Sequence, residues 1–449
     1  MHQETNVVCP ACACVCDDLT LSIEENQLVD VGPPCPLAER WFRDNSQPTG
    51  PVAAIEGEET TLEVGLARAA AILREARYPL IYGLSRSSTP GQRAAVELAD
   101  RIGAVVDTTA SLCHGPSIIA LQNVGESTCT LGEVSNRSDL VIFWGCNPAE
   151  THPRHAERYS VFPRGQFVPE GRASRTVVMI GDAREVHDWR LDSSGSRPDI
   201  VVPVVPGRDF EAITTLQLLL KGLSAEGASP EQMGAALPDL QLLAERMKAC
   251  RSGVVFFGLG LTGTSCDRPT TESLGHANVE RLLRLVAELN SFTRFYARRM
   301  RLQGDVSGAD SVLCWQTGYP FSVDLSRGYP RYEPGEFSAN DLLERGELDA
   351  CLIVGTETIP AFSAKAEQHL RDIPTIVLDY PAAQPKFTPT VHFTTAPYGL
   401  FAPGTIYRMD EVPLPLRSYL DGPWPTDEAV LQRLLSLTAE TAETMQPLE

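Results

Sequence analysis

Short runs of apolar residues recur along most of this chain, and helix-like segments separate them. Residues 140–144 (LVIFW) and 254–257 (VVFF) are typical of these runs. A strand covered by helices on both faces of its sheet is continuously apolar instead of alternating. The pattern therefore predicts parallel sheets in an α/β protein of the doubly wound, Rossmann-like type. The predicted strands are residues 79–83, 104–107, 140–144, 176–180, 200–202, 254–257, 352–354 and 375–378, and predicted helices include 62–76 and 93–102.

Size and charge limit the classes of protein to which the chain can belong. Its 449 residues suit two or three domains, or one large α/β assembly. A formal net charge of −20 argues against a nucleic-acid-binding protein, because phosphate recognition needs concentrated Lys and Arg. No segment approaches the roughly 20 apolar residues of a membrane span, and residues 1–10 (MHQETNVVCP) lack the apolar core of a signal peptide. We therefore expect a cytoplasmic protein with reduced thiols.

Cysteines are concentrated at the start of the chain. Cys9, Cys12 and Cys16 are followed by Cys35, and a hairpin of residues 19–23 and 28–31 is predicted between the last two. Zinc ribbons usually hold their ion with two short CxxC turns, whereas these spacings favour a [4Fe–4S] cluster bound by four thiolates. Cys14 is an alternative to Cys16 as a ligand. A zinc site and plain free thiols remain alternatives to the cluster.

Two of the predicted strands lead into similar loops. Each strand follows an Asp and ends in a Gly, at Gly145 and Gly355, and the next strand in each half ends in an acidic residue, at Asp182 or Asp379. Doubly wound sheets bind nucleotides at the carboxyl ends of their strands, where an acidic side chain can contact a ribose or a base. We therefore predict two halves, each with a nucleotide pocket. The alternative is that these glycines serve only turns.

Cys113 and His114 follow the strand that is predicted to end near Asp107. The cysteine is a candidate nucleophile activated by imidazole, a candidate soft-metal ligand, or a buried thiol without a chemical role. Adjacent side chains point in different directions, which weakens the first interpretation. A thiolate ligand beside an acid–base histidine is consistent with a heavy-metal cofactor.

Several stretches together resemble the molybdopterin oxidoreductases and, within them, the family of formylmethanofuran dehydrogenase B subunits. They are residues 9–19 (CPACACVCDDL), 112–117 (LCHGPS), 140–154 (LVIFWGCNPAETHPR), 159–165 (YSVFPRG), 315–332 (WQTGYPFSVDLSRGYPRY) and 404–413 (GTIYRMDEVP). The resemblance implies the fold of formate dehydrogenase and DMSO reductase domains 1–3 without their β-barrel cap. It implies an iron–sulfur domain (1–50), a first pterin-dinucleotide domain (51–112 plus 310–449) and a second one (113–309).

The resemblance also assigns roles to individual residues. It implies that Cys113 binds the metal, that His114 handles the proton, and that Arg301, or alternatively Arg299, contacts the substrate. Where the family has a lysine between cluster and pterin, this chain offers Arg40. The implied cluster ligands are Cys9, Cys12, Cys16 and Cys35, and the implied dinucleotide contacts are Gly145, Asn147, Asp182, Arg184, Gly207, Asp209, Gly355 and Asp379.

A member of this family would interconvert CO2 and formate or formylmethanofuran, as in methanogenesis. Its implied cofactors are a [4Fe–4S] cluster and a bis(pyranopterin guanine dinucleotide) with tungsten or molybdenum. Its implied partners in one complex are the amidohydrolase-type A subunit, the C subunit and the D subunit, which forms the cap. A ferredoxin-like electron carrier and substrates of the methanofuran pathway are implied as well.

Two other functions agree with the same residues. The chain also resembles the B subunit of a formyltransferase/hydrolase complex in tetrahydromethanopterin-linked one-carbon metabolism, which is a scaffold without redox chemistry. The presence of both cysteine sets favours the redox function, because a scaffold has no chemical need for them. A soluble formate dehydrogenase catalytic chain is the third possibility, and the missing cap domain counts against it.

Overall fold

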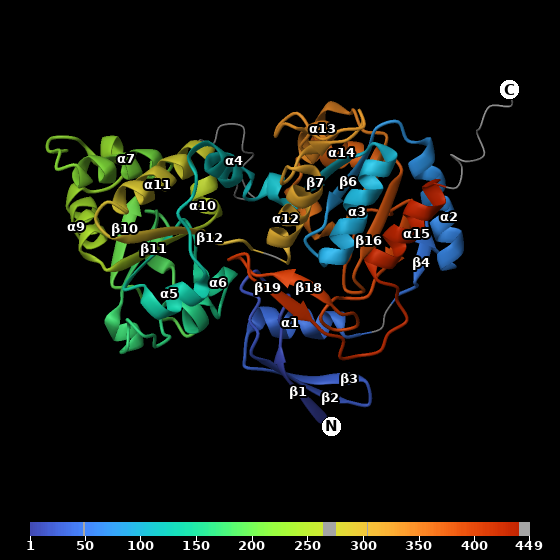
Figure 1. The fold of residues 1–449 in the computed structure, drawn as a ribbon, viewed down its shortest axis with the longest axis horizontal. Helices are drawn as coiled ribbons and strands as arrows, with labels where there is room; N and C mark the ends of the chain where they lie inside the picture. The colour runs from blue at the N-terminus through green and yellow to red at the C-terminus, as the bar shows by residue number, and fades with distance from the viewer. Residues whose placement is uncertain (48–49, 264–274, 303, 440–449) are drawn as a thin grey trace. The chain divides into compact units, whose positions relative to one another are not determined.

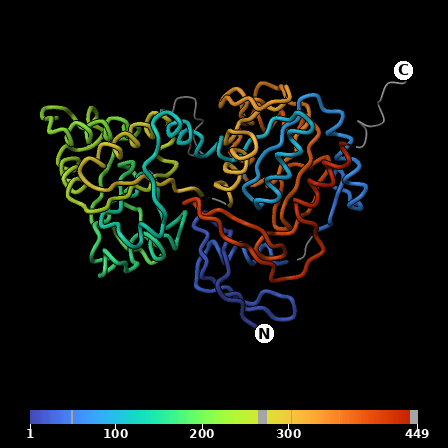
Figure 2. The backbone as a smooth tube through the Cα atoms, in the orientation of Figure 1, coloured from blue at the N-terminus to red at the C-terminus, as the bar shows by residue number. Residues whose placement is uncertain are grey.

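The computed structural model describes residues 1–47, 50–263, 275–302 and 304–439 (Figure 1). It divides into two compact units, of which the first is Met1–Leu112 with Gln303–Glu449 and the second is Cys113–Leu302. The first unit contains both the blue beginning and the red end of the chain, whereas the second is one continuous insertion (Figure 2).

The second unit is built on a five-stranded sheet in which every neighbouring pair is parallel. Its order is β10-β9-β8-β11-β12, so the strand order reverses between β8 and β11. This is the Rossmann order, in which ligands bind at the reversal. The strands are β8 (Leu140–Trp144), β9 (Thr176–Asp182), β10 (Ile200–Val204), β11 (Ser252–Phe257) and β12 (Arg294–Arg299).

Helices bury one face of this sheet, and a region of short elements lies against the other. The first face packs on α4 (Gly115–Val124), α7 (Asp209–Leu220), α9 (Leu237–Ala249) and α11 (Gly275–Leu289). On the opposite face, the rings of Phe143 and Phe256 stack with His155 against them. Two short helices, α8 (Pro230–Met233) and α10 (Leu259–Thr262), contribute Met233 and Leu261 to the core of the first face. The other short elements are α5 (Leu131–Arg137), α6 (Pro148–Thr151), a π-helix (Ala156–Ser160) and 3-10 turns at Gly171–Ser174 and Val186–Asp188.

The first unit contains a nine-stranded sheet of order β14-β13-β7-β6-β15-β16-β17-β4-β5. Its five central strands are parallel and reverse their order between β6 and β15, as in flavodoxin-like sheets. Both edges are antiparallel. The strands are β4 (Ala53–Ile55), β5 (Glu58–Thr60), β6 (Pro79–Gly83), β7 (Val105–Thr108), β13 (Val323–Asp324), β14 (Arg331–Tyr332), β15 (Ala350–Val354), β16 (Thr375–Asp379) and β17 (Val391–Thr394).

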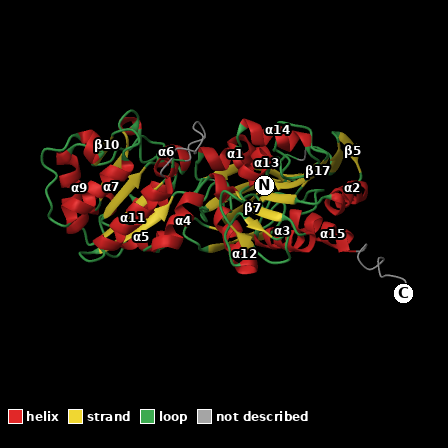
Figure 3. Cartoon of the chain, turned by 90° about the horizontal axis from the view of Figure 1, so that it is seen from above, coloured by secondary structure: helices red, strands yellow, loops and turns green. Residues whose placement is uncertain are grey.

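Two groups of helices cover the faces of this sheet (Figure 3). On one face lie α2 (Leu62–Glu75), α3 (Thr89–Ile102), α12 (Val306–Thr317) and α15 (Asp427–Ala439). On the other lie α13 (Ala339–Arg345) and α14 (Ala364–Asp372). The remaining elements are the sheet β1 (His2–Val7), β2 (Leu19–Glu24) and β3 (Gln27–Gly32), helix α1 (Pro36–Asn45), the hairpin β18 (Gly404–Tyr407) and β19 (Pro413–Leu416), and 3-10 turns at Thr109–Leu112 and Thr356–Ala361.

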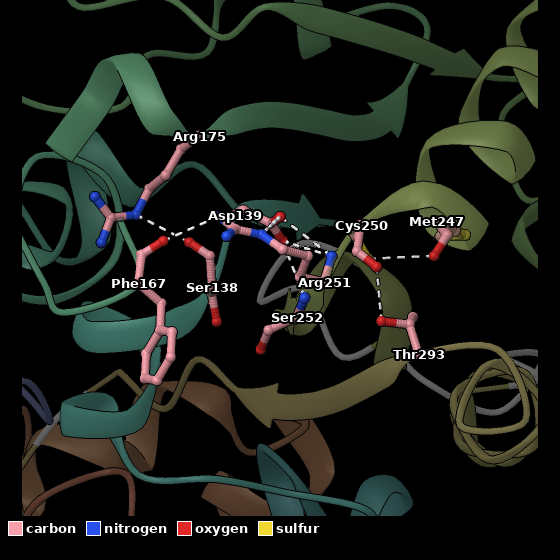
Figure 4. Close-up of polar contacts among 9 residues, drawn as sticks. All are labelled: Ser138, Asp139, Phe167, Arg175, Met247, Cys250, Arg251, Ser252 and Thr293. Atoms are coloured by element: carbon pink, nitrogen blue, oxygen red, sulfur yellow. Dashed lines mark hydrogen bonds and ion pairs between the residues drawn. The ribbon is translucent and has the colours of Figure 1, made fainter. Parts of the chain in front are cut away.

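An aspartate fastens the amino ends of the strands in each unit. The Asp139 carboxylate accepts hydrogen bonds from the backbone N–H groups of Arg251 and Ser252, and from the Arg251 side chain (Figure 4). Asp349 likewise accepts from the N–H groups of Arg77 and Tyr78, at 2.7 and 2.9 Å. These are the aspartates of the Asp–strand–Gly pattern. They lie at the end of the sheet opposite the glycines, so they hold neighbouring strands together and do not line a nucleotide pocket.

The structure confirms the predicted α/β class with parallel sheets, and all of the predicted strands belong to these two sheets. The hairpin predicted before Cys35 is β2–β3, with Glu25 and Asn26 at its turn. The antiparallel edge strands were not predicted, because they are short and some are polar. Within the described ranges, no helix has the length and apolar character needed to cross a membrane.

Asp305 holds together four segments of the first unit. Its buried carboxylate accepts from the N–H groups of Gly308, at the start of α12, and Tyr407, on β18. It also accepts from the Gln92 amide on α3, while its own N–H donates to the Ser85 carbonyl. Burial raises the pKa of Asp305 to about 7 despite these donors. The carboxyl therefore stabilises the fold most at low pH, and this contribution is lost as the pH rises through 7.

We predict that Asp305→Asn makes stability less dependent on pH. An amide cannot ionise, so the free energy of unfolding should fall less between about pH 5 and about pH 8 than in the unsubstituted chain. The difference should be roughly 3 kcal/mol, because about two pH units lie between about pH 5 and the pKa of Asp305 and each contributes about 1.4 kcal/mol. Urea denaturation at both pH values measures the difference. The exposed Asp372→Asn is the control. Equal pH dependence in Asp305→Asn and the unsubstituted chain would contradict the expectation.

Candidate functional site

The first part of the candidate site is a tight loop of buried cysteines in the first unit. The Cys9 N–H donates to the Cys16 carbonyl at 2.8 Å, and the Val15 N–H donates to the Cys12 carbonyl at 3.1 Å. Val15 has a φ of +40°, which turns the chain inside the loop. The hairpin β2–β3 then leads back to Cys35, which immediately precedes α1. Cys9, Cys12, Cys14, Cys16 and Cys35 are all buried.

These thiols lie close enough to affect one another's ionisation. Burial, followed by the charges of Cys12 and Cys16, raises the pKa of Cys9. A hydrogen bond from Cys14 lowers the pKa of Cys12, and the positive charge of Arg86 lowers it further. Cys14 therefore lies beside Cys12 within the loop.

A [4Fe–4S] cluster fits the donor set of this loop. Across the residues that the structure describes, no group of three or more His, Cys, Asp or Glu side chains is arranged to hold a single metal ion. The ligands of a cube each bind a different iron, so they surround the cluster instead of meeting at one point. Buried thiols that interact through their charges are suited to that role in kind and in number.

Arg86 connects the cysteine loop to the end of the central sheet. It follows β6, and its Nη1 donates to the carbonyl of Pro10, between the first two cysteines, at 3.2 Å. Its Nε donates to Glu357, in the turn that follows β15, at 2.5 Å. The Tyr380 hydroxyl donates to the Arg86 carbonyl. The guanidinium therefore lies where the strand order reverses, with its charge acting on Cys12.

The expectation that Arg40 supplies the charge beside the cluster finds no support in its surroundings. The Arg40 side chain is 82% exposed and pairs with Asp44 one turn along α1, at 3.5 Å. Sequence reasoning missed Arg86. The available signal was its place three residues after the glycine that ends a buried strand.

Both predicted strand–loop glycines lie at a reversal of strand order. Gly145, which follows β8, has a φ of +62°, and a Cβ there would come within 2.6 Å of the backbone nitrogen of Leu261, in the short helix α10 after β11. The Gly260 N–H donates to the Gly145 carbonyl at 3.0 Å. Gly355 follows β15 with a φ of +87°, and a Cβ there would meet the Arg86 side chain at 3.4 Å. Backbone at these points can come close to a bound phosphate or ribose.

The predicted acidic contacts already have protein partners. Both oxygens of Asp379 accept from Thr356, at 2.8 Å from its N–H and 2.6 Å from its hydroxyl, and burial raises the pKa of Asp379 to about 7. Asp209 accepts from the indole of Trp144 at 2.8 Å, and burial raises its pKa to about 6. These two carboxylates fix the loops and helix starts beside the strand ends.

The other predicted dinucleotide contacts lie near the same end of the second sheet. Asp182, at the end of β9, forms an ion pair with the largely exposed Arg184. The Asn147 side-chain oxygen, in the loop after β8, accepts from the Arg190 N–H at 3.2 Å. Gly207 has a φ of +74° just before α7, with no atom near the place that a Cβ would take.

Cys113 and His114 begin the second unit beside buried arginines. Cys113 is partly exposed, whereas His114 is fully buried at the start of α4. Burial, followed by the positive charges of Arg301 and Arg299, lowers the pKa of His114 well below its usual value. Both arginines are at least nine-tenths buried, and Arg299 forms an ion pair with Glu126 at 3.2 Å. The structure therefore brings His114, the sequence neighbour of Cys113, close to both candidate arginines.

A second buried histidine reaches this group, which sequence reasoning did not identify. The His152 Nε2 lies 2.5 Å from the carbonyl oxygen of Arg301, and burial lowers the pKa of His152 to about 4. His152 lies in a matched stretch of the sequence, but no spacing rule linked it to the segment around residue 301.

Comparison with known proteins identifies similar chains along nearly the whole sequence. The chain is 39% identical over 433 residues to the B subunit of tungsten-containing formylmethanofuran dehydrogenase 2 from Methanocaldococcus jannaschii, covering 93% of this chain and 94% of that one. It is 36% identical over 433 residues to the protein of the same name in Methanococcus maripaludis, covering 94% and 95%.

More distant similarity extends to a second complex. The chain is 25% identical over 312 residues to the B subunit of the formyltransferase/hydrolase complex Fhc from Methylorubrum extorquens, covering 69% of this chain and 75% of that one. A chain in the crystal structure of the FhcABCD complex from that organism, with methylofuran, has a TM-score of 0.70 at 22% identity, covering 87% of this chain and 99% of that chain. This likeness concerns the fold alone. No protein-family model matches the sequence.

We predict that Arg86→Gln destabilises the first unit. The substitution removes a charged hydrogen-bond donor from Glu357 and Pro10, and hydrogen bonds of charged groups contribute about 1.5–3 kcal/mol. Thermal unfolding of the two variants Arg86→Gln and Arg40→Gln provides the comparison, since Arg40 is exposed. Only Arg86→Gln should lower the unfolding temperature; an equal decrease in both variants would contradict the role of Arg86.

Proposed function

The chain belongs to the family of formylmethanofuran dehydrogenase B subunits, and from this premise we propose that it is a redox-active catalytic component of such an enzyme. In this proposal it interconverts CO2 and formate or formylmethanofuran in one-carbon metabolism. The observation that carries the proposal is the combination of a buried cysteine loop with a second, partly exposed cysteine beside a histidine and two buried arginines.

The two groups of cysteines, the buried loop and Cys113, would each hold a different cofactor. Cys9, Cys12, Cys16 and Cys35 would hold a [4Fe–4S] cluster in a small domain of residues 1–50, and Arg86 would face its Cys12 ligand. Cys113 would be the protein ligand of tungsten or molybdenum carried by a bis(pyranopterin guanine dinucleotide). When bound, that centre would accept the two electrons released as the C–H bond of formate breaks.

The chain's own residues would bind the substrate and handle its proton. The Arg301 guanidinium would hold the carboxylate, because a planar fork matches that group. His114 would handle the proton. Its Nε2 lies 3.3 Å from the Met300 carbonyl and therefore carries a hydrogen, which leaves Nδ1, 3.3 Å from the Ser117 hydroxyl, as the nitrogen able to take up a proton.

The dinucleotides would bind at the two reversals of strand order, one in each unit. In domains of residues 51–112 plus 310–449 and 113–309, as in molybdopterin oxidoreductases, the phosphates and riboses would bind at the carboxyl ends of the strands, next to the glycine turns after β8 and β15. The largely exposed Arg184 carries the charge that suits a phosphate, whereas the carboxyl groups of Asp209 and Asp379 are engaged with Trp144 and Thr356.

The protein would work within a complex in the cytoplasm, where its thiols stay reduced. Its partners would be the amidohydrolase-type A subunit, the C subunit, the cap-forming D subunit and a ferredoxin-like carrier that receives electrons from the cluster. Similarity to a chain of the FhcABCD complex is consistent with a role in a larger assembly.

The same similarity supports a second candidate function, a scaffold in a formyltransferase/hydrolase complex without redox chemistry. A scaffold places no demand on Cys113 or on the cysteine loop, and the fold comparison covers 87% of the chain. The two candidates therefore differ in metal content.

We predict that the complex purified without oxygen contains about four irons and about one tungsten or molybdenum for each copy of this chain. Metal analysis by plasma mass spectrometry, together with the spectrum of the reduced cluster, measures this. An intact complex free of iron and of both heavy metals would support the scaffold instead.

We predict that Cys113→Ala abolishes formate oxidation but leaves the iron content unchanged, because its thiol lies outside the cysteine loop. Dye reduction by formate and metal analysis measure the two effects. Cys250→Ala is the matched control, since Cys250 lies at the amino end of β11 and its thiol donates to the Met247 carbonyl (Figure 4). Full activity of Cys113→Ala would rule out the ligand role.

A further inference from the structure

Two buried histidines hold consecutive carbonyl groups of the second unit. The His114 Nε2 lies 3.3 Å from the Met300 oxygen, and the His152 Nε2 lies 2.5 Å from the Arg301 oxygen. His114 begins α4, whereas His152 ends the short helix α6. Two separate loops therefore hold the backbone that carries Arg301.

The contact with Arg301 defines the protonation of His152. A nitrogen facing a carbonyl oxygen must carry a hydrogen, because two lone pairs would repel each other. The other nitrogen, Nδ1, lies 2.8 Å from the oxygen of the Thr151 hydroxyl, a group that also contacts the Asn147 carbonyl at 3.0 Å. Burial keeps His152 in this neutral form, since it lowers the pKa of the ring to about 4. The ring thus donates at a fixed position throughout the physiological pH range.

Its neighbours prevent the ring from turning away. His152 is fully buried, and its ring meets the His155 ring edge to face, with 6.3 Å between the two ring centroids. His155 in turn packs against Phe256 on β11. His152 directly follows helix α6, whose N-cap is Asn147 in the loop after β8. The His152 ring therefore links the loop after β8 to the backbone of Arg301.

We propose that His152 is a positioning residue, which sets the direction of the Arg301 side chain by holding its carbonyl group. The inference rests on the proposed function, in which Arg301 binds the carboxylate of formate. His152 touches no substrate in this proposal and acts only through the backbone of residue 301. Displacements of about 1 Å by residues remote from the chemistry can reduce turnover by two orders of magnitude.

The test compares His152→Leu, which removes the donor, with His152→Gln, whose amide nitrogen reaches a position similar to that of Nε2. In the purified complex, with formate as substrate and a viologen dye as acceptor, we expect His152→Leu to raise the KM for formate by about tenfold or more. His152→Gln should restore most of the affinity. A matched control is His369→Leu, which removes a histidine–carbonyl bond of 2.9 Å to Leu348 in the first unit. It should leave the KM unchanged.

Two further measurements separate positioning from general destabilisation. Hydrogen exchange of the amides of residues 299–302 should accelerate in His152→Leu but not in His152→Gln, whatever the activity. In an Arg301→Gln background, His152→Leu should raise the KM no further, because its effect passes through Arg301. Additive effects of the two substitutions would overturn the inference.

The remaining outcomes distinguish this inference from the proposed function. An active complex in which His152→Leu has the KM of the unsubstituted enzyme would overturn the positioning role alone. A metal-loaded complex that fails to reduce the dye with formate would overturn the proposed function and the inference with it.

Discussion

The rest of this structure depends on one requirement of parallel strands that are buried on both faces. The backbone polar groups at the ends of these strands must find hydrogen-bond partners. At the amino ends, Asp139 and Asp349 supply acceptors for the first N–H groups of neighbouring strands. At the carboxyl ends, turns with positive φ at Gly145 and Gly355 bring loops close to one another. One end of each sheet is thus closed by internal hydrogen bonds, and the chemically varied side chains gather at the other.

The candidate site is held mainly by buried polar groups with defined protonation. Arg86 remains charged and connects three segments, whereas His114 and His152 are neutral donors to backbone carbonyls. Burying these groups costs free energy unless they are hydrogen-bonded. Each such bond therefore fixes a loop geometry that apolar packing alone would leave variable.

Sequence reasoning anticipated the features that depend on local pattern. Continuous apolar runs located the central strands, and the cysteine spacing with its turn residues located the loop and hairpin before Cys35. It did not find contacts that depend on tertiary distance. Arg86 is separated from Glu357 by 271 residues and His152 from Arg301 by 149, so no periodicity links either pair. Arg40 was proposed as a substitute for a lysine of the family, yet its side chain is exposed and pairs with Asp44.

The second unit is a single insertion between Leu112 and Gln303, so its two junctions with the rest of the chain are defined in sequence. Cys113 is the first residue after one junction, and Arg301 lies two residues before the other. The residues proposed to bind metal and substrate thus belong to the inserted second unit, whereas the cysteine loop belongs to the first unit. Substitutions can therefore change the cysteine loop, or the residues proposed to bind metal and substrate, without changing the core of the other unit. A fold of this construction can pass between an electron-transferring and a purely architectural role by local substitutions, while its sheets stay the same.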